Sequence, residues 1–435
     1  MAIEAMGKPT TTLIYQYFSN DAQSTASSRG MPNLRVIPEP IVSECTVTEE
    51  IEAGVAGVFD QIIANLTRPL TAEERVPKAK EPEKLSRISF KGNLAEVNRF
   101  FYQRGWTDGL PVIPPTEEAV AEMVAASGLP ADHLVARVEP RRGKATVEQI
   151  AINAVMGGAL PSYMPVLIAG VKVFTSNPTS ATMTVSTGSW SPFWFINGPV
   201  RKALNLNSSY GTLNPGDIAN ATIGRAMSLI LKNIGGIRKG VEDMGVFGNP
   251  GRYTMVAAEN EEESPWEPLH VEAGLKKEDS AITLSFPHAF QQLNSYATDD
   301  MGILATIVSN LYPGRMGLLG IILTPPVAKA LGSRGWTKKK IKEYLVANAK
   351  TTLDHTTRFY SAPDRDKMNP HEVVPIFPAV GPRPPEISIY VFGGYGSWEG
   401  LLSGGSGSTG KIELPADWEK TAAKYRNVVP SYARY

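Results

Sequence analysis

The chain has 435 residues, 42% of them hydrophobic, and its 43 Lys and Arg side chains balance 43 Asp and Glu side chains, so the formal net charge is zero. A balanced charge provides no long-range field for a polyanion, which excludes nucleic acid as the expected partner. The length exceeds that of one typical hydrophobic core and predicts two domains, or one large domain with an appendage.

Cysteine content and the N-terminal segment indicate the compartment. The single cysteine, Cys45, excludes an internal disulfide and a cysteine-rich zinc site, and it suits a reducing environment. The apolar run near the N-terminus is too short for a signal peptide, and no apolar stretch approaches the roughly 18 residues of a membrane span. We therefore expect a cytoplasmic protein without a membrane partner.

Residues 1–70 contain two predicted strands followed by a predicted helix. The strands are TTLIYQYF at 11–18 and LRVIPEPI at 34–41, both rich in β-branched or aromatic residues. The helix covers 46–66, where apolar residues recur at helical spacing. This is a partial α/β domain, too small to hold a core alone. Residues 71–90, dense in charge and proline, read as a linker.

Residues 91–435 alternate helical patterns with short apolar strands, which predicts a large body of the α/β or α+β class. The first helix opens with the capping box Asn93–Glu96. Further helices are predicted at 146–156, 163–174, 217–233, 299–311 and 337–349, and strands at ATMTVST, PFWFING, YTMVAA, SAITLSF, GLLGIIL and ISIYVFGG. An Arg-Gly-Trp-Thr and an apolar-x-Pro-Pro occur twice in opposite order, which we attribute to coincidence.

Two glycine-rich stretches near the C-terminus fail as nucleotide motifs. GGSGSTGK at 404–411 has the spacing of a phosphate-binding loop, but Ile412 replaces the hydroxyl residue and Pro415 interrupts the helix that should follow. We expect a flexible loop over a site instead. In YVFGGYGSWEG the third glycine comes one residue late for a dinucleotide fingerprint. The sequence requires no cofactor.

Polar residues at the ends of predicted elements are candidates for substrate binding. Asn197 stands in a tight turn directly after a strand, and Asn220 and Arg225 lie in the first turns of a helix launched by Asn-Pro-Gly-Asp. Such positions present ligand contacts on a rigid scaffold, and an arginine at a helix N-terminus suits a carboxylate or phosphate. Asp108, in the loop WTDGLP, is a candidate acid or base.

The stretch ENEEESPWEPLHVEAG, 259–274, is the strongest candidate for a catalytic site. Its prolines impose a rigid extended path that Trp266 anchors, so the side chains of Glu259, Glu261 and His270 take fixed positions. Trp266 is also a candidate for substrate binding. If this part is a strand, His270 and Glu272 point the same way. They would then form a carboxylate-oriented base or two ligands of a metal. A structural histidine remains the third alternative, and no spacing supplies a third metal ligand.

Five stretches in one order carry a resemblance to a known family: RGWTDGLPVIPPTEE, AINAVMGGALPSYMPVLIAGVKV, NGPVRKALNLN, ANATIGRAMSLILKNIGG and AENEEESPWEPLHVEAG. They are similar to the large region of the UGSC-motif selenoprotein family, in which selenocysteine or cysteine precedes Gly-Ser-Cys. The resemblance implies an enzyme of small-molecule metabolism with thiol or selenol chemistry, and residues 1–70 as the remnant of a flavodoxin-like or thioredoxin-like redox domain.

The motif itself, Cys-Gly-Ser-Cys, is absent from the chain, and Cys45 does not replace it. Either a second subunit supplies the motif or the redox site has been lost. Because an incomplete sheet would expose an unpaired edge, we expect the second subunit and a hetero-oligomer.

Three functions follow as hypotheses. The first is an oxidoreductase or C–X-cleaving enzyme in which a partner's thiolate or selenolate attacks a small polar or anionic substrate. Asp108, Glu259, Glu261 and His270 would then act as acid/base groups. The second is a lyase or hydrolase that uses the carboxylates and imidazole alone. The third is a non-catalytic scaffold subunit.

Overall fold

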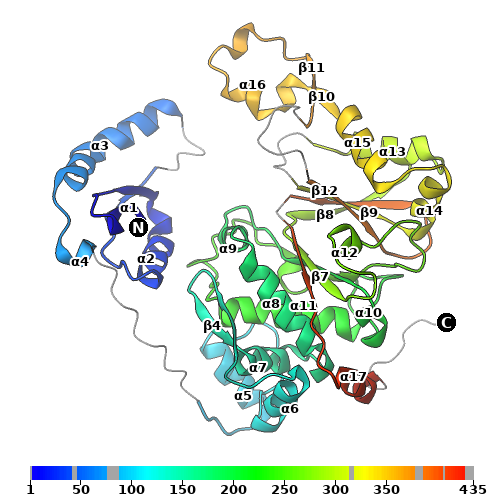
Figure 1. Cartoon of the computed structure of the whole chain (residues 1–435). Helices are drawn as coiled ribbons and strands as arrows, with labels where there is room; N and C mark the ends of the chain where they lie inside the picture. The colour runs from blue at the N-terminus through cyan, green and yellow to red at the C-terminus, as the bar shows by residue number, and fades with distance from the viewer. Residues whose placement is uncertain are drawn as a thin grey trace.

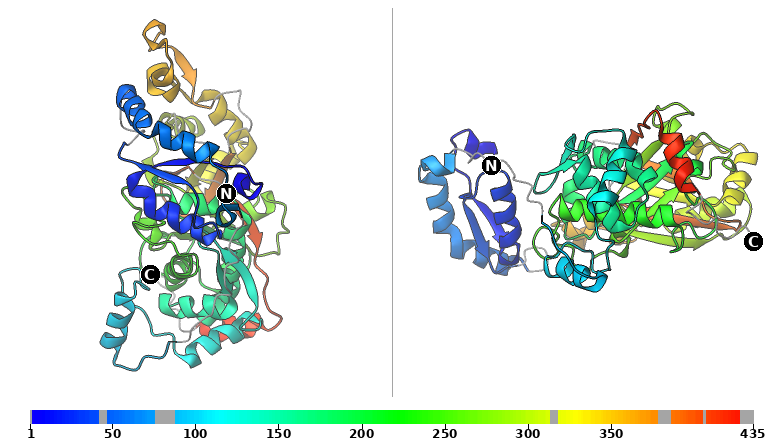
Figure 2. Two further views of the ribbon diagram at one scale, coloured as in Figure 1. Left: turned by 90° about the vertical axis from the view of Figure 1, so that its left-hand side faces the viewer. Right: turned by 90° about the horizontal axis from the view of Figure 1, so that it is seen from below.

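The computed structural model describes residues 2–41, 47–75, 88–312, 318–377, 386–404 and 407–426. Cys45 lies outside these ranges. The chain forms an N-terminal unit, residues 2–75, and a body that begins at residue 88, and both mix helices with small sheets. Figure 1 and Figure 2 show the N-terminal unit beside the body. Within the described ranges, no helix has both the length and the apolar character needed to cross a bilayer.

The N-terminal unit is built around a two-stranded parallel sheet, in which β1 (Thr12–Tyr15) pairs with β2 (Val36–Glu39). The helices of this unit are α1 (Ala2–Ala5), α2 (Ser19–Ser28), α3 (Thr48–Thr67) and α4 (Ala72–Arg75). The second predicted strand and the predicted helix are therefore confirmed, and the first strand is confirmed for residues 12–15, whereas residues 16–18 form a 3-10 helix. The buried Arg35 guanidinium holds Glu74 of α4 at 2.8 Å, and Ser24 of α2 donates to Glu242 of the body at 2.6 Å.

A layer of helices forms the largest core of the body. It contains α6 (Glu117–Ser127), α7 (Val147–Gly157), α8 (Met164–Ser176) and α11 (Ile218–Asn233). Before them, α5 (Leu94–Gln103) starts at the predicted capping box, with both reciprocal bonds between Asn93 and Glu96. Close packing of α7 on α11 requires Gly157, since a Cβ there would meet the Ala226 nitrogen at 3.0 Å.

Two four-stranded sheets follow, and they share one topology. The first sheet has the order β6 (Val256–Ala258), β5 (Phe193–Asn197), β7 (Ala281–Ser285), β14 (Ser408–Lys411). The second has the order β12 (Glu386–Val391), β9 (Leu318–Leu323), β13 (Trp398–Ser403), β8 (Ala289–Asn294). In each sheet the first pair is parallel and the next two pairs are antiparallel.

Two pairs of successive strands connect the two sheets. β7 lies in the first sheet and β8 in the second, whereas β13 lies in the second sheet and β14 in the first. The register is the same in both sheets: Ala281 pairs with Lys411 and Asn294 with Trp398. These two pairs of strands therefore link the two sheets.

The sequence carries a trace of this repetition that was missed in the sequence analysis. After β5 and Gly198 the chain reads PVRKAL, from Pro199, and after β9, Thr324 and Pro325 it reads PVAKAL, from Pro326. These stretches open the helices α10 (Val200–Ala203) and α14 (Pro325–Ser333). Pro-Val-x-Lys-Ala-Leu thus follows the equivalent strand of each sheet in the same order.

The sheets pack face to face through an aromatic core made by Phe193, Phe195, Ala257, Leu269, Ile322, Tyr390, Phe392 and Leu402. We call the space between them the inter-sheet layer. The opposite face of the second sheet is covered by α13 (Asp300–Ser309), α14 and α15 (Lys338–Asn348). The remaining elements are the hairpins of β3 (Leu134–Val138) with β4 (Gly143–Thr146) and of β10 (Lys350–Thr352) with β11 (Val373–Pro375), and the helices α9 (Ser180–Val185), α12 (Leu269–Glu272), α16 (Thr357–Ser361) and α17 (Trp418–Arg426).

Two predicted elements are wrong. ATMTVST, 181–187, is not a strand but belongs mostly to α9, where the Thr184 hydroxyl donates back to the Ser180 and Ala181 carbonyls of the preceding turn. The stretch 404–411, expected to be a flexible loop, contains the edge strand β14, because Gly410 leaves room for Val173 of α8 to pack on the sheet.

Candidate functional site

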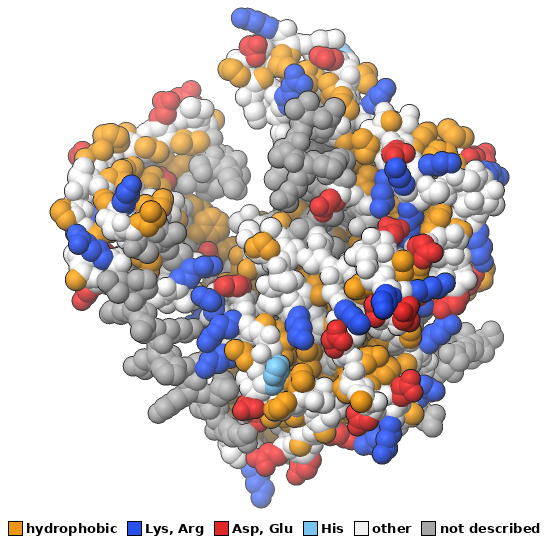
Figure 3. Space-filling model, viewed as in Figure 1, with side chains coloured by type: hydrophobic (Ala, Val, Ile, Leu, Met, Phe, Trp, Pro, Cys, Tyr) orange, Lys and Arg blue, Asp and Glu red, His pale blue; other side chains and the backbone are white. Residues whose placement is uncertain are grey.

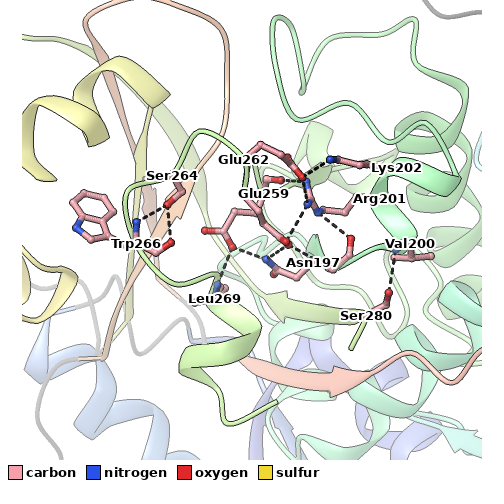
Figure 4. Close-up of polar contacts among 12 residues, drawn as sticks. Asn197, Val200, Arg201, Lys202, Glu259, Glu262, Ser264, Trp266, Leu269 and Ser280 are labelled. Atoms are coloured by element: carbon pink, nitrogen blue, oxygen red, sulfur yellow. Dashed lines mark hydrogen bonds and ion pairs between the residues drawn. The ribbon is translucent and has the colours of Figure 1, made fainter. Parts of the chain in front are cut away.

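Asn197 and Glu259 meet at the carboxyl ends of two parallel strands. Asn197 ends β5 and Glu259 directly follows β6, so both side chains enter the inter-sheet layer. Asn197 Nδ2 donates to Glu259 Oε2, and also to Glu261 Oε1 at 3.2 Å. Figure 4 shows the side chains of Asn197 and Glu259 pointing toward each other. Three of the predicted site residues therefore do come together.

Arg201 binds residues 259–272, which we call the acidic segment, through its guanidinium. Its side chain is only 5% exposed, and Nη2 lies 3.0 Å from both Glu261 Oε2 and Glu262 Oε1. Nη1 donates to the backbone carbonyl of Glu259. Burial would raise the pKa of Glu262, but hydrogen bonds from Arg201 and Lys202 outweigh it and lower that pKa to about 2.

Glu259 is the most buried of the acids, with no exposed surface. Its Oε2 accepts a second hydrogen bond from the Leu269 backbone N–H at 2.8 Å. Lys338, from α15 of the second sheet's helical layer, lies 3.8 Å from Oε1. Burial raises the pKa of Glu259, and it outweighs the nearby Lys338 ammonium and the two hydrogen bonds, which act in the opposite direction.

Several buried polar atoms in this part of the body lack a hydrogen-bond partner. Among the described residues these include Asn197 Oδ1, Glu259 Oε1 and both ring nitrogens of His270, a residue with no exposed surface. His270 directly follows Leu269, whose N–H binds Glu259. Because buried polar groups are nearly always hydrogen-bonded, unpaired atoms on three neighbouring elements mark a place with unused binding capacity.

The strand expected at His270 and Glu272 is wrong, since both belong to the short helix α12. Residues two apart on a helix point about 200° apart, so His270 turns inward while Glu272 binds Lys338 at 2.7 Å and Lys342 at 3.5 Å. The proposed shared direction of imidazole and carboxylate is lost. Among the residues that the structure describes, no group of three or more His, Cys, Asp or Glu side chains is placed to hold a metal ion.

Asp108 and Arg225 lie elsewhere and pair with each other. Arg225 Nε and Nη2 donate to the two Asp108 oxygens at 2.8 and 2.9 Å, and Nη2 also donates to the Pro111 carbonyl. This bidentate pair fastens the loop WTDGLP to α11. Asp108 also borders a cavity of about 220 Å³ beside α11.

Asn220 and Trp266 contact backbone groups. Asn220 Oδ1 accepts from the Asn207 N–H at 2.9 Å, and its Nδ2 donates to the Asn207 carbonyl, which fixes the turn before α11. Trp266 Nε1 donates to the Trp336 carbonyl at 2.8 Å, and the ring packs on the core below the second sheet. In Figure 4 the Trp266 ring points away from Glu259.

Two features of the site escaped the sequence analysis. Lys338 opens α15, where the helix dipole disfavours a cation, so a buried lysine there signals a carboxylate partner. The second feature is a cavity of about 370 Å³ at the ends of β9 and β12, lined by residues that include Tyr210, Phe290, Phe392, Tyr395 and Trp398.

The cavity is linked to the acidic segment. The Asn260 N–H donates to the Val391 carbonyl at 2.8 Å, and the Tyr395 hydroxyl donates to Glu263. One face of the second sheet thus borders both the cavity and the inter-sheet layer that contains Glu259.

Comparison of the chain with protein-family models, with curated proteins and with solved structures finds no match.

Proposed function

We propose that the chain is an enzyme subunit that acts on a small molecule by acid–base catalysis, with Glu259 as the proton-transferring group and His270 as the second candidate. The observation that carries this proposal is the set of unpaired buried polar atoms on Asn197, Glu259 and His270. Structural roles account for neighbouring acids, but they leave these atoms without partners.

The surroundings of Glu259 fit such a role. A general acid or base works best when its pKa lies near the working pH, and burial moves the pKa of Glu259 upward from its ordinary value. Asn197 and the Leu269 N–H fix Oε2, so Oε1 alone remains to exchange a proton. The cavity at Tyr395 and Trp398 gives room for a small substrate on the same side of the second sheet.

The test compares two isosteric variants. Purified wild-type chain, with any protein that copurifies, is incubated with a metabolite extract, and the compounds consumed and formed are followed by mass spectrometry. Glu259→Gln should slow the conversion at least about 100-fold, the usual contribution of a general acid or base. Glu267→Gln, which removes an exposed carboxylate of the same segment, should convert at the wild-type rate. Turnover by Glu259→Gln at the wild-type rate would refute the role.

A second candidate is the thiol- or selenol-dependent enzyme that the family resemblance implies. One observation favours it: the two-stranded sheet of the N-terminal unit is accompanied by α3, of which no residue is buried. Phe59, Ile63 and Leu66 share one apolar stripe and are 54%, 44% and 42% exposed. Figure 3 shows hydrophobic side chains at the surface of this unit.

In this candidate, residues 1–70 are the remnant of a redox domain that a second subunit completes. The partner's thiolate or selenolate attacks a substrate carbon and forms a bond to it, and the displaced group leaves with its bonding electrons. Burial of an exposed apolar stripe of this kind is typical of an interface.

Native mass measurement distinguishes the candidates. A copurifying small chain, lost in a Phe59→Glu variant, together with activity abolished by a thiol-alkylating reagent, supports the redox enzyme. Activity of the isolated chain that alkylation leaves unchanged supports acid–base catalysis alone. Wild-type turnover of an assembled complex with Glu259→Gln and His270→Ala would indicate a scaffold subunit.

A further inference from the structure

The cavity of about 220 Å³ that Asp108 borders lies apart from the site of Glu259. Three of its lining residues, Ser228, Leu231 and Lys232, belong to α11, which packs on the face of the first sheet opposite to the inter-sheet layer. A ligand in this cavity would therefore be separated from Glu259 by the sheet.

The charges around this cavity favour an anion. Its lining contains the cations Lys232, Lys239 and Arg252 and the acids Asp108 and Asp243. Both acids are already paired: Asp108 with Arg225, and Asp243 Oδ2 with Arg252 Nη1 at 2.6 Å. The two lysines leave a positive excess.

Arg252 supplies a specific donor. Nε donates to the Trp190 carbonyl at 3.0 Å and Nη1 binds Asp243, which fixes the plane of the guanidinium. Nη2 is buried and has no hydrogen-bond partner among the described residues. A buried charged donor without an acceptor is costly, and a charge-assisted hydrogen bond to an anion removes that cost.

The other walls define the rest of the ligand. Pro192, Leu231, Ile237 and the ring of Tyr253 face the same cavity, so an apolar group of about one ring in size would be covered. We infer that this cavity binds a small organic anion, whose carboxylate or phosphate group accepts from Arg252 Nη2 while its apolar part lies against these side chains. The inference does not rest on the catalytic role of Glu259.

Isothermal titration calorimetry of the full chain with four matched probes tests the inference: benzoate, phenyl phosphate, benzyl alcohol and benzylammonium. The two anions should bind at least about 10-fold more tightly than the alcohol and the ammonium, since one charge-assisted hydrogen bond distinguishes them. Whichever anion binds more tightly identifies the head group. Equal binding of benzyl alcohol and benzoate, or no binding of either anion, would overturn the inference.

Variants locate the binding. Arg252→Gln should weaken benzoate about 10- to 100-fold, but it also removes the bonds to Trp190 and Asp243. Ser228→Phe therefore serves as the second variant, because it fills the cavity from α11 and leaves every charge in place. It should abolish binding, whereas Lys277→Gln, an exposed lysine outside the cavity lining, should bind as the wild type does. Unchanged affinity of Ser228→Phe would exclude this cavity.

Discussion

Truncation of Glu259 tests the geometry of the candidate site without knowledge of the substrate. Among the described residues, Glu259 is the one acceptor of the buried Leu269 N–H, and Glu259→Ala removes it. Asn197 Nδ2 keeps its bond to Glu261, and Lys338 keeps its ion pair with Glu272. One unsatisfied buried donor costs about 1–3 kcal/mol, and the space left by the side chain adds about 1 kcal/mol. We expect Glu259→Ala to lower the free energy of unfolding by about 2–4 kcal/mol.

Glu259→Gln separates the hydrogen bonds from the charge. The amide oxygen can still accept from Asn197 and from Leu269, so this variant should lose no more than about 1 kcal/mol. Urea unfolding at pH 7, followed by tryptophan fluorescence, measures both. Unfolding of Glu259→Ala at the same urea concentration as the wild type, or equal instability of the two variants, would contradict a stabilising hydrogen bond from the Leu269 N–H to Glu259.

The pH dependence of the same pair gives a second check. Because burial raises the folded-state pKa of Glu259 above its ordinary value of 4.5, the fold favours the protonated carboxyl. The stability contributed by this group is present below about pH 4.5 and is lost as pH rises through the folded pKa. Glutamine does not titrate, so Glu259→Gln should gain stability relative to wild type as pH rises. A constant difference between pH 4 and pH 8 would contradict the raised pKa.

Two further predictions concern the buried cations. Arg201→Met leaves Glu261 and the Glu259 carbonyl without their partner, so it should lower the free energy of unfolding of the body by about 3–5 kcal/mol in urea. The control is Lys202→Met, at a side chain that is 70% exposed, which should lower it by about 1 kcal/mol or less. In the N-terminal unit, the bond from Arg35 lowers the pKa of Glu74 to about 2, so its contribution to stability is present above pH 4.5 and is lost as pH falls through 2. The hydrogen-exchange protection factors of the α4 amides, which correct for the slower intrinsic exchange in acid, should therefore fall between pH 4.5 and pH 2 in the wild type, and Glu74→Gln should remove that step.

Local patterns in the sequence predict local elements well. The Asn93 capping box, the helix after Thr146 and the helix after Thr337 all start where the capping residues place them. A cap is satisfied by atoms within three residues, so its signal is complete in the sequence. The helix α9 and the strands β8 and β13 were missed because their conformation depends on distant partners.

In the candidate site too, contacts at the ends of local elements could be predicted from the sequence, and contacts with distant partners could not. Asn197 and Glu259 could be brought together from the sequence because each stands at the end of a readable strand, and parallel neighbours end at the same edge. Trp266 could not be placed, since its partner Trp336 lies on another element. The partner of Arg225, Asp108, is 117 positions away, and nothing local distinguishes it from other aspartates.

The repeated topology explains why acids gather in the segment 259–272. An open cavity lies at the ends of β9 and β12. At the equivalent ends of β5 and β6, this segment and Lys338 occupy the corresponding space. Two buried cations, Arg201 and Lys338, need counter-charges there, and Glu261, Glu262 and Glu272 supply them.

These ion pairs with Arg201 and Lys338 do not require Glu259. Its nearest cation, Lys338, is 3.8 Å from Oε1 but already binds Glu272 at 2.7 Å and the Glu267 carbonyl at 2.8 Å. A carboxyl group kept for structure alone is expected to have both oxygens hydrogen-bonded, and a glutamine would satisfy Asn197 and Leu269 equally well. If Glu259→Gln matches the wild type in stability yet converts no substrate, the unpaired oxygen is retained for chemistry; if it matches the wild type in both, the acidic segment serves the fold only.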